Sequence, residues 1–318
     1  MGQDRFSGID GTHKEDILEL VGDVLLPASL WLIMFSMGLS LTLEDFGRVF
    51  TNRHALIVGA ASMLLALPLL GATIALAFAP TPALAVGFVL LATCPGGMLS
   101  NLMTDIAKGD LALSLSLSIL VSLVYVFIVP FYAFGATSYF LGIDGIIQVP
   151  VLSSIGRIFS ITLLPVSLGV IFRRLQPALA IAGKPYIKWG ATTILVIAFV
   201  AILVDQVDTL RAAFGPLLFM VALMNILALA MAFGFCRMTR VRDTERIAIC
   251  IEHLIRQEGT AIYIAVSILG NKEMSLPMII NTPVALVICI AFVMLTRWRM
   301  SVRSQKLASN ANRIPVER

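Results

Sequence analysis

The densest polar cluster in this sequence lies inside a long apolar stretch, residues 245–270. Five strongly polar side chains fall within seven positions of it: Glu252, His253, Arg256, Gln257 and Glu258. If the stretch crosses a bilayer, each charge near the centre costs roughly 2.5–3.5 kcal/mol, so the cluster must face the protein interior. The cluster is either a site for an ion or polar ligand, or a buried structural ion pair.

A second unusual segment is a proline followed by two glycines. Pro95 lacks a backbone N–H, and Gly96 and Gly97 are poor helix formers, so a helix is expected to break here. Backbone groups freed at membrane depth are tolerated only inside protein or beside a polar cavity. Ser100 and Asn101 follow directly, which favours a binding site over a kink that merely aids packing.

The elements that must position these residues are membrane-spanning helices. The chain has 318 residues, of which 58% are hydrophobic and only 42 are charged (23 Lys and Arg, 19 Asp and Glu). Its mean hydropathy is +0.94. About a quarter of the residues of a soluble domain are charged, so the composition excludes a cytosolic enzyme, a nucleic-acid-binding protein and a secreted disulfide scaffold. The prediction is an all-α polytopic membrane protein.

Hydropathy predicts about nine spanning helices, because each crossing takes roughly 20 apolar residues. The runs are too continuous for the alternating strands of a membrane barrel. The predicted spans are residues 18–42, 54–79, 83–106, 111–137, 150–172, 186–205, 210–235, 245–270 and 275–296. Broken helices over 83–106 and 245–270, the second including Gly259 at its break, are typical of an inverted-repeat transporter fold in which the two broken helices cross.

Basic residues predict the orientation of the chain. Alternate loops and the C-terminal tail place 17 Lys and Arg on one side, against 4 on the other, and cytoplasmic loops are enriched in these residues. A polar N-terminus (residues 1–17) is therefore expected outside the cell membrane. It is followed by a transmembrane transporter domain (18–296) and a basic cytoplasmic tail (297–318).

Two stretches of the sequence resemble signatures of the bile acid:sodium symporter family. The run 34–46, Met-Phe-Ser-Met-Gly-Leu-Ser-Leu-Thr-Leu-Glu-Asp-Phe, is similar to the family's MFGMGLTLTxEDF. The run 94–101, Cys-Pro-Gly-Gly-Met-Leu-Ser-Asn, is followed by Ala-Lys-Gly-Asp-Leu-Ala-Leu-Ser at 107–114, as in that family. The resemblance covers about residues 20–296. It implies ten helices in two inverted five-helix repeats, divided into a core and a panel domain, with the first helix lacking here.

The resemblance also implies a sodium site. Carried over by position, its ligands are Ser100, Asn101, Ser114, Ser118 and Glu252, all of which have oxygen-bearing side chains. Sodium is a hard cation that binds oxygen atoms, so a sodium ion is the expected coupling ion and no other cofactor is expected. The four cysteines are scattered without the spacing of metal ligands, so no transition metal is expected.

The sequence departs from the family at a second sodium site. The family pattern on the eighth span is E-x-G-x-Q-N, whereas Arg256 stands at the glutamine position and Gln257 at the asparagine position. The partner glutamine corresponds to Met63. Arginine is always charged and cannot bind a cation, so Arg256 is predicted to fill the second ion's place as a tethered positive charge. It is expected to pair with Glu252, which shares a helix face with it if the helix is continuous there, or with Glu258.

The substrate contacts implied by the resemblance change as well. Met98 stands in the expected substrate site where the family usually has a threonine, which removes a polar contact. Four polar residues are expected to contact the substrate instead: Gln257, His253, Asn281 and Thr282. The N-termini of broken helices and Arg256 offer positive potential. The expected partner is therefore a small organic carboxylate or sulfonate rather than a bile acid, and no nucleic acid is expected to bind.

The leading hypothesis is a secondary active transporter of an organic anion that works by alternating access. One alternative is a proton-coupled or facilitative carrier, because Glu252, His253 and Glu258 could carry protons. Another is a membrane sensor that binds the same ligand without transporting it. An intramembrane protease is not favoured, since the sequence has no second histidine at the HExxH spacing, no GxSG serine and no paired GxGD aspartates.

Overall fold

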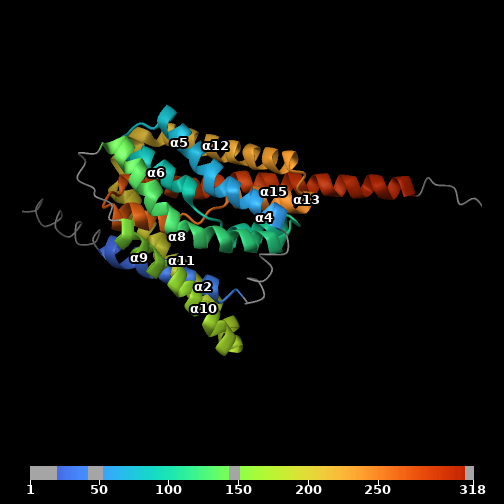
Figure 1. Cartoon of the computed structure of the whole chain (residues 1–318), viewed down its shortest axis with the longest axis horizontal. Coiled ribbons are helices and arrows are strands. Elements are labelled where there is room, and N and C mark those ends of the chain that lie inside the picture. The colour runs from blue at the N-terminus through green and yellow to red at the C-terminus, as the bar shows by residue number, and fades with distance from the viewer. Residues whose placement is uncertain (1–19, 42–52, 143–150, 312–318) are drawn as a thin grey trace, which may run out of the picture.

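The computed structural model describes residues 20–41, 53–142 and 151–311, and they form an all-helical protein (Figure 1). Within these ranges the structure has one isolated β-bridge, between Gly96 and Arg256, and no other strand pairing. Seven helices of the described chain are long and apolar enough to cross a membrane, judged by length and composition. The predicted class, an all-α polytopic membrane protein, is confirmed, while the number of nine crossings stays a prediction.

The helices follow one another with short connections. The first elements are η1 (Val21–Leu25), α2 (Leu26–Gly38), α4 (Arg53–Ala61), η2 (Ser62–Ala66), α5 (Leu67–Phe78), α6 (Pro82–Thr93), α7 (Met98–Ile106) and α8 (Leu111–Leu141). The later elements are α9 (Val151–Ile161), α10 (Leu163–Leu175), α11 (Pro177–Asp205), α12 (Val207–Met238), α13 (Asp243–Leu254), α14 (Gly259–Tyr263), η3 (Ile264–Ile268), η4 (Glu273–Ser275) and α15 (Leu276–Ala311). Each of the two predicted broken spans thus consists of two helices with a non-helical stretch between them.

Several helices extend beyond the hydropathy spans, and two of these extensions are long. Gln176 alone separates α10 from α11, so the predicted connection between the fifth and sixth spans is itself helical on both sides. Helix α15 continues to Ala311, far beyond its predicted end at residue 296. The reason is that Lys and Arg are good helix formers, whereas hydropathy detects only the apolar part of a helix.

The helices form two groups in space (Figure 1). Helices α2, α9, α10 and α11, here called the panel group, lie together, with α2 packed against α10 and α11. Helices α4–α8 and α12–α15, here called the core group, lie beside them; α6 packs between α5 and α8, and α12 packs on α13 and α15. Both interrupted segments belong to the core group.

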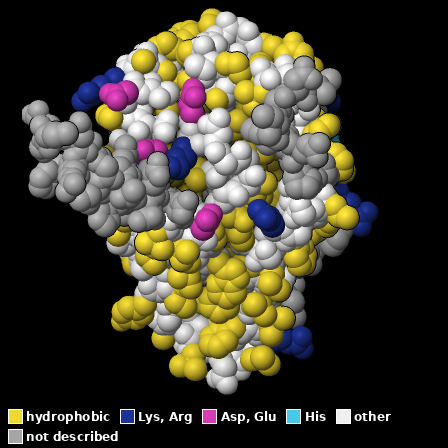
Figure 2. All heavy atoms as spheres, turned by 90° about the vertical axis from the view of Figure 1, so that its left-hand side faces the viewer, with side chains coloured by type: hydrophobic (Ala, Val, Ile, Leu, Met, Phe, Trp, Pro, Cys, Tyr) yellow, Lys and Arg dark blue, Asp and Glu magenta, His cyan; other side chains and the backbone are white. Residues whose placement is uncertain are grey.

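Burial in the core group agrees with a bundle inside lipid. Helix α6 is buried on every side from Ala83 to Thr93, as expected for a helix surrounded by other helices. Large apolar side chains such as Leu69, Phe131 and Ile226 point outward instead. Figure 2 shows one end of the molecule, where hydrophobic side chains cover much of the surface and charged ones are few.

A close helix contact holds the panel group together. Gly38 of α2 and Gly169 of α10 lie so near one another that a Cβ atom added to Gly38 would be 2.9 Å from the Gly169 Cα. Small residues let helix backbones approach in a membrane, where packing replaces the hydrophobic effect between helices. Glycines at these two positions therefore fix α2 against α10 beside the cavity described below.

Candidate functional site

The two interrupted segments meet at their breaks. The backbone is extended at the end of α6 and again at the end of α13. Gly96 and Arg256 form an antiparallel bridge, and the Gln257 N–H donates to the Pro95 carbonyl at 2.7 Å. The backbone groups that the two breaks leave free of helical hydrogen bonds therefore bond to each other inside the protein, as is required in a membrane. The structure brings together the two breaks that the sequence predicts.

The structure also brings together the five residues predicted to bind sodium. The fully buried Glu252 carboxylate accepts hydrogen bonds from Ser100 at 2.7 Å, from Ser114 at 2.5 Å, and from Ser118 at 3.1 and 3.2 Å. Asn101 joins through its side-chain oxygen, which lies 2.8 Å from the Ser114 hydroxyl. We call these five residues the serine cage. Their role as ion ligands stays a prediction.

The serine cage has more acceptor oxygens than hydroxyl protons. Ser114 has one hydroxyl proton but faces both the Glu252 carboxylate and the Asn101 oxygen. Ser100 likewise faces both Glu252 and the Gly97 carbonyl, the latter at 2.6 Å. Among the described residues no Lys, Arg or His nitrogen lies within 4 Å of Glu252. The donor set is therefore short of positive charge and fits a hard monovalent cation such as sodium.

Glycine is required where the first break touches the cage. A Cβ atom on Gly96 would collide with the Glu252 carboxylate, so a larger residue there would displace it. Gly259 opens α14 and packs against Leu30 of α2, where a Cβ would meet the Leu30 side chain at 2.5 Å. The two glycines thus hold the breaks against the cage on one side and against the panel group on the other.

Three helices position the serine cage. Helix α7 supplies Ser100 and Asn101 from its first turn, and α13 supplies Glu252 from its last. Ser114 and Ser118 lie on α8 and are four positions apart, so they share one face of that helix. The site is therefore built from helix ends and one helix face, and its geometry depends on how α8 and α13 are held together.

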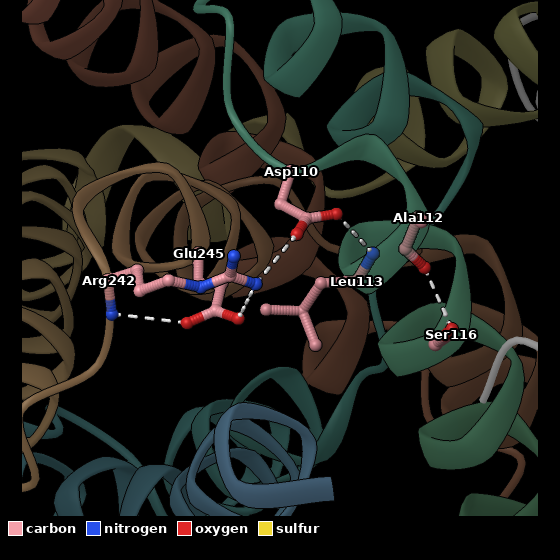
Figure 3. Close-up of polar contacts among 6 residues, drawn as sticks. All are labelled: Asp110, Ala112, Leu113, Ser116, Arg242 and Glu245. Carbon is pink, nitrogen blue, oxygen red and sulfur yellow. Dashed lines mark hydrogen bonds and ion pairs between the residues drawn. The ribbon is translucent and has the colours of Figure 1, made fainter. Parts of the chain in front are cut away.

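A polar cluster joins the start of α8 to the start of α13 (Figure 3). The Asp110 carboxylate accepts from the Leu113 N–H at 3.0 Å, which caps α8, and lies 3.9 Å from the Arg242 guanidinium. Arg242 also binds Glu245 in the first turn of α13. The hydrogen bond to Glu245 raises the pKa of the Arg242 guanidinium, which therefore stays charged. The backbone N–H of Asp110 donates to the Thr244 carbonyl at 2.9 Å and completes the link.

Arg256 does not form the ion pair predicted from the sequence. No carboxylate of the described residues lies within 4 Å of its guanidinium. The reason is that α13 ends at Leu254, so Glu252 and Arg256 are not on successive turns of one helix. Its two terminal nitrogens instead donate to the Leu91 carbonyl at 3.4 Å and to the Asn225 side-chain oxygen at 3.0 Å. Leu91 lies in the last turn of α6, where carbonyl dipoles favour a cation.

Two buried asparagines connect Arg256 to Glu258. Asn225 accepts from Arg256 and donates to the Asn281 side-chain oxygen at 2.6 Å. Asn281 donates to one oxygen of the Glu258 carboxylate, and the Thr282 hydroxyl donates to the other. We call the line from Arg256 through the two asparagines to Glu258 the asparagine relay. Asn281 and Thr282 therefore bind Glu258, and their predicted contact with substrate stays a prediction.

An apolar cavity of about 480 Å³ lies between the panel group and the core group. Helices α2, α9 and α10 form one wall, and α8 with both breaks forms the other. Most lining side chains are apolar, for example Met34, Phe159 and Val170, while Gln257 and Thr260 provide polar groups at the break. Gln257 thus lies where a substrate residue was predicted, with its amide 3.3 Å from the Met34 sulfur.

Two cavity-lining residues have buried hydroxyl groups that make no hydrogen bond of good geometry with the described residues: Ser122, and Tyr125, whose hydroxyl neighbours Thr93. Both belong to α8. Buried polar groups without a partner are uncommon in native proteins, so these hydroxyls are candidates to bind a ligand. Sequence reasoning identified neither of them, nor Asn225. The signal that could have found Asn225 is a single amide in an otherwise apolar run of α12.

His253 and Met98 do not line the cavity. His253 is fully buried; its Nδ1 lies 2.8 Å from the Ile249 carbonyl and its Nε2 shares a hydrogen bond of 3.0 Å with the Ser62 hydroxyl. Met98 begins α7, and its sulfur accepts a hydrogen bond from Ser40 at 3.8 Å. Of the five residues predicted to contact substrate, Gln257 is the one that the described cavity wall includes.

Fold and site together define a class of protein. The breaks of two interrupted helices meet beside a buried carboxylate, and a cavity lies between two groups of helices. This arrangement is that of the secondary transporters, whose sites form between broken helices near the membrane centre. The chain belongs to the Sodium Bile acid symporter family, which matches residues 27–213, more than half of the 318.

Individual relatives agree with this assignment. The chain is 28% identical over 287 residues to the probable sodium/metabolite cotransporter BASS2, chloroplastic, of Oryza sativa subsp. japonica, covering 89% of this chain and 65% of that protein. It is 27% identical over 235 residues to the uncharacterized sodium-dependent transporter YocS of Bacillus subtilis (strain 168), covering 72% and 70%. It is 31% identical over 185 residues to the ileal sodium/bile acid cotransporter of Cricetulus griseus, covering 58% and 53%.

The aligned region covers only part of the length of some of these relatives. The chain spans less than two thirds of the length of the first and the third of them. All three are named as transporters rather than enzymes, which agrees with the prediction that this protein is not an enzyme.

Proposed function

We propose that this protein is a secondary active transporter that carries an organic anion together with one sodium ion by alternating access. The observation that carries the proposal is the fully buried Glu252 carboxylate, held by three serine hydroxyls. A buried charge without a counter-charge is strongly unfavourable. A cation that enters with the substrate would therefore stabilise the site, and its absence would leave it incomplete.

Sodium is the cation that suits the serine cage. Glu252 provides one negative charge, and Ser100, Asn101, Ser114 and Ser118 provide neutral oxygens. One charge with several neutral oxygens matches a monovalent hard cation better than a soft or divalent metal. The relatives named as sodium cotransporters support the same choice.

The break between cage and cavity is suited to couple the two ligands. Gly96 abuts the Glu252 carboxylate, while its neighbour Pro95 lines the cavity. Gln257, which bonds to the Pro95 carbonyl, lines the cavity as well. An ion that orders Glu252 would therefore fix the backbone that forms the polar end of the substrate cavity.

The cavity supports an organic anion with an apolar body as the substrate. Its walls are largely apolar, and its volume of about 480 Å³ falls within the usual range of small-molecule sites, roughly 300–1,000 Å³. Gln257, Ser122 and Tyr125 offer donors that could bind the oxygens of a carboxylate or sulfonate. A bile acid is the less favoured substrate from the sequence, where Met98 replaces the threonine usual in the family, although Met98 itself lies outside the cavity wall.

Arg256 is proposed to take the place of a second coupling ion. Its guanidinium lies at the last turn of α6 and donates to the Leu91 carbonyl. Carbonyl groups at the end of a half-helix bind sodium in other secondary transporters. A cation attached to the chain cannot be transported, so the proposed stoichiometry is one sodium ion for each anion.

The proposed location is the cell membrane, with the N-terminus outside and the C-terminus in the cytoplasm. The distribution of Lys and Arg between alternate loops supports this orientation. Fusing a reporter active only in the cytoplasm to residue 318 tests it. A reporter that is active only at the N-terminus would contradict the proposed orientation.

Uptake into proteoliposomes tests the transport proposal. Labelled organic anions, each a carboxylate or sulfonate with an apolar body, are offered with an inward gradient of sodium or of choline. Uptake that requires sodium and is lost in Glu252→Gln supports the proposal. Uptake unchanged in choline but driven by a pH gradient would replace it with proton coupling. Binding without counterflow of labelled substrate would instead indicate a sensor.

A further inference from the structure

We infer that Glu258 is the fixed counter-charge of Arg256, acting through the asparagine relay, and that this pairing sets the sodium affinity of the serine cage. The inference rests on the proposed function in that it takes the cage to bind sodium. Its new content is the role of Glu258, Asn225 and Asn281, which lie outside both the cage and the cavity wall.

All hydrogen bonds of the asparagine relay run in one direction, from donor to acceptor, from Arg256 to Glu258. Arg256 donates to Asn225, Asn225 donates to Asn281, and Asn281 donates to Glu258. An amide turned the other way would place its NH₂ group against the guanidinium, donor against donor. Each amide therefore directs its negative end towards Arg256 and its positive end towards Glu258. Aligned hydrogen bonds of this kind polarise one another and stabilise both charges.

Water does not take over this role, because the relay is buried. Asn225 and Asn281 are 0% exposed, Glu258 is 6% exposed and Arg256 is 7% exposed. The second hydrogen of the Asn225 amide is also used, since it donates to the Val221 carbonyl at 2.8 Å. Both oxygens of Glu258 accept hydrogen bonds, from Asn281 and Thr282, as an ionised carboxylate requires.

The relay changes the charge that the cage presents to a cation. Glu258 and Arg256 together have no net charge, which leaves the Glu252 carboxylate as the charge that attracts sodium. If Glu258 were neutral, Arg256 would be an uncompensated cation in a region of low dielectric, where Coulomb effects are strong. It would repel sodium from the cage. It would also attract an anionic substrate, because its neighbour Gln257 lines the cavity.

The test is Glu258→Gln, which removes the charge and keeps the size of the side chain. The sodium concentration for half-maximal uptake is expected to rise on the order of tenfold, while the KM for the anion falls. A change that merely disturbed the fold would worsen both together, and that result would overturn the inference. Thr282→Val removes a donor to Glu258 without changing any charge, so it should shift the sodium dependence in the same direction but less than Glu258→Gln does.

The double variant Arg256→Gln/Glu258→Gln distinguishes a charge effect from a local one. It removes both members of the pair and is expected to restore the wild-type sodium dependence. Arg256→Gln alone leaves Glu258 unpaired, which should attract a second sodium ion and raise the Hill coefficient for sodium above one. If Glu258→Gln had the same effect with and without Arg256, Glu258 would not act through Arg256 and the inference would fail.

Asn225→Ala provides an independent test if Glu258→Gln does not fold. It interrupts the relay and keeps both charges, so the half-maximal sodium concentration should rise about threefold. Unchanged sodium dependence in a folded Asn225→Ala would overturn the inference. Failure of this inference can be distinguished from failure of the proposed function. If wild-type uptake is equal in sodium and in choline, both are overturned. If wild-type uptake depends on sodium but the relay variants have the same sodium dependence as the wild type, the inference alone is overturned.

Discussion

Two carboxylates lie six positions apart in the same interrupted segment, and the protein stabilises them in different ways. Glu252 is surrounded by hydroxyl groups from α7 and α8, and among the described residues no cationic side chain lies within 4 Å of it. Glu258 is bound by an amide and a hydroxyl from α15 and is connected to Arg256 through the relay. Glu258 thus has a counter-charge within the chain, in Arg256, whereas Glu252 has none among the described residues within 4 Å.

The comparison separates two roles for a buried carboxylate: one is neutralised within the chain, and the other can respond to ions from solution. A carboxylate with a resident counter-charge needs nothing from solution, so its state does not respond to an ion gradient. A carboxylate with only neutral donors responds to every change in cation concentration. Under the proposed function, the ion dependence of transport therefore depends on Glu252, and the ion-independent charge is that of Arg256 and Glu258.

The largest effect is expected for Glu252→Gln. Loss of the one negative charge of the cage should lower sodium-driven uptake on the order of a hundredfold to a few thousandfold, because breaking a buried charge pair costs about 3–5 kcal/mol. Initial rates of uptake in proteoliposomes measure it. The same substitution at Glu258 should shift the sodium dependence without abolishing it. Equal and complete loss in both variants would remove the distinction between the two carboxylates.

A smaller effect is expected for Ser114→Ala. It removes one cage ligand and should raise the half-maximal sodium concentration about tenfold, since a hydrogen bond to a charged group contributes about 1.5 kcal/mol. Ser116→Ala is the matched control, because the Ser116 hydroxyl donates to the Ala112 carbonyl at 2.7 Å on the same helix and not to the cage. Similar sodium titrations for the two variants would contradict the ligand role of Ser114.

Tyr125→Phe tests whether the cavity is separate from both carboxylates. Removing the hydroxyl should raise the KM for the anion about threefold to fivefold and leave the sodium dependence unchanged, because neutral hydrogen bonds contribute about 1 kcal/mol. The melting temperature of the substrate-free protein should rise, since a buried hydroxyl without a described partner is removed. A lower melting temperature with unchanged KM would show that the hydroxyl is used inside the protein.

The smallest effect is expected at the link between α8 and α13. Asp110→Asn retains a capping side chain but loses the charge facing the exposed Arg242, so uptake should change less than twofold. Asp110→Ala also loses the cap and should destabilise the protein by about 1 kcal/mol. Chemical denaturation and sodium titration of both variants check this. A strong sodium defect in Asp110→Asn would make the link part of the coupling site.

The serine cage could be predicted because the sequence resembles a known family, and two local signals agree with that resemblance. Ser114 and Ser118 are separated by one helical turn, and Pro95 with the two following glycines marks the first break. It was the resemblance that combined the two serines with Ser100, Asn101 and Glu252, because serines in a membrane helix by themselves are more typical of packing. The spacing of two serines and a Pro-Gly-Gly tripeptide are features that a single sequence shows.

The asparagine relay could not be predicted, because it depends on contacts between distant segments. Asn225 precedes Arg256 by 31 positions, and nothing in the spacing joins them. The residues between Glu252 and Glu258 include neither proline nor glycine, so the end of α13 at Leu254 has no local signal. The helix ends there because its backbone pairs with the other break, and the expected pairing of Glu252 with Arg256 was wrong for this reason.

Sodium binding to the purified, substrate-free protein tests the central claim most directly. Thermal unfolding is followed while sodium replaces choline at constant ionic strength, in the wild type and in Glu252→Gln. We predict saturable stabilisation of the wild type with a Hill coefficient of one, and none in the variant. Equal melting temperatures of the wild type in sodium and in choline would contradict the claim that Glu252 and its serines bind a single sodium ion.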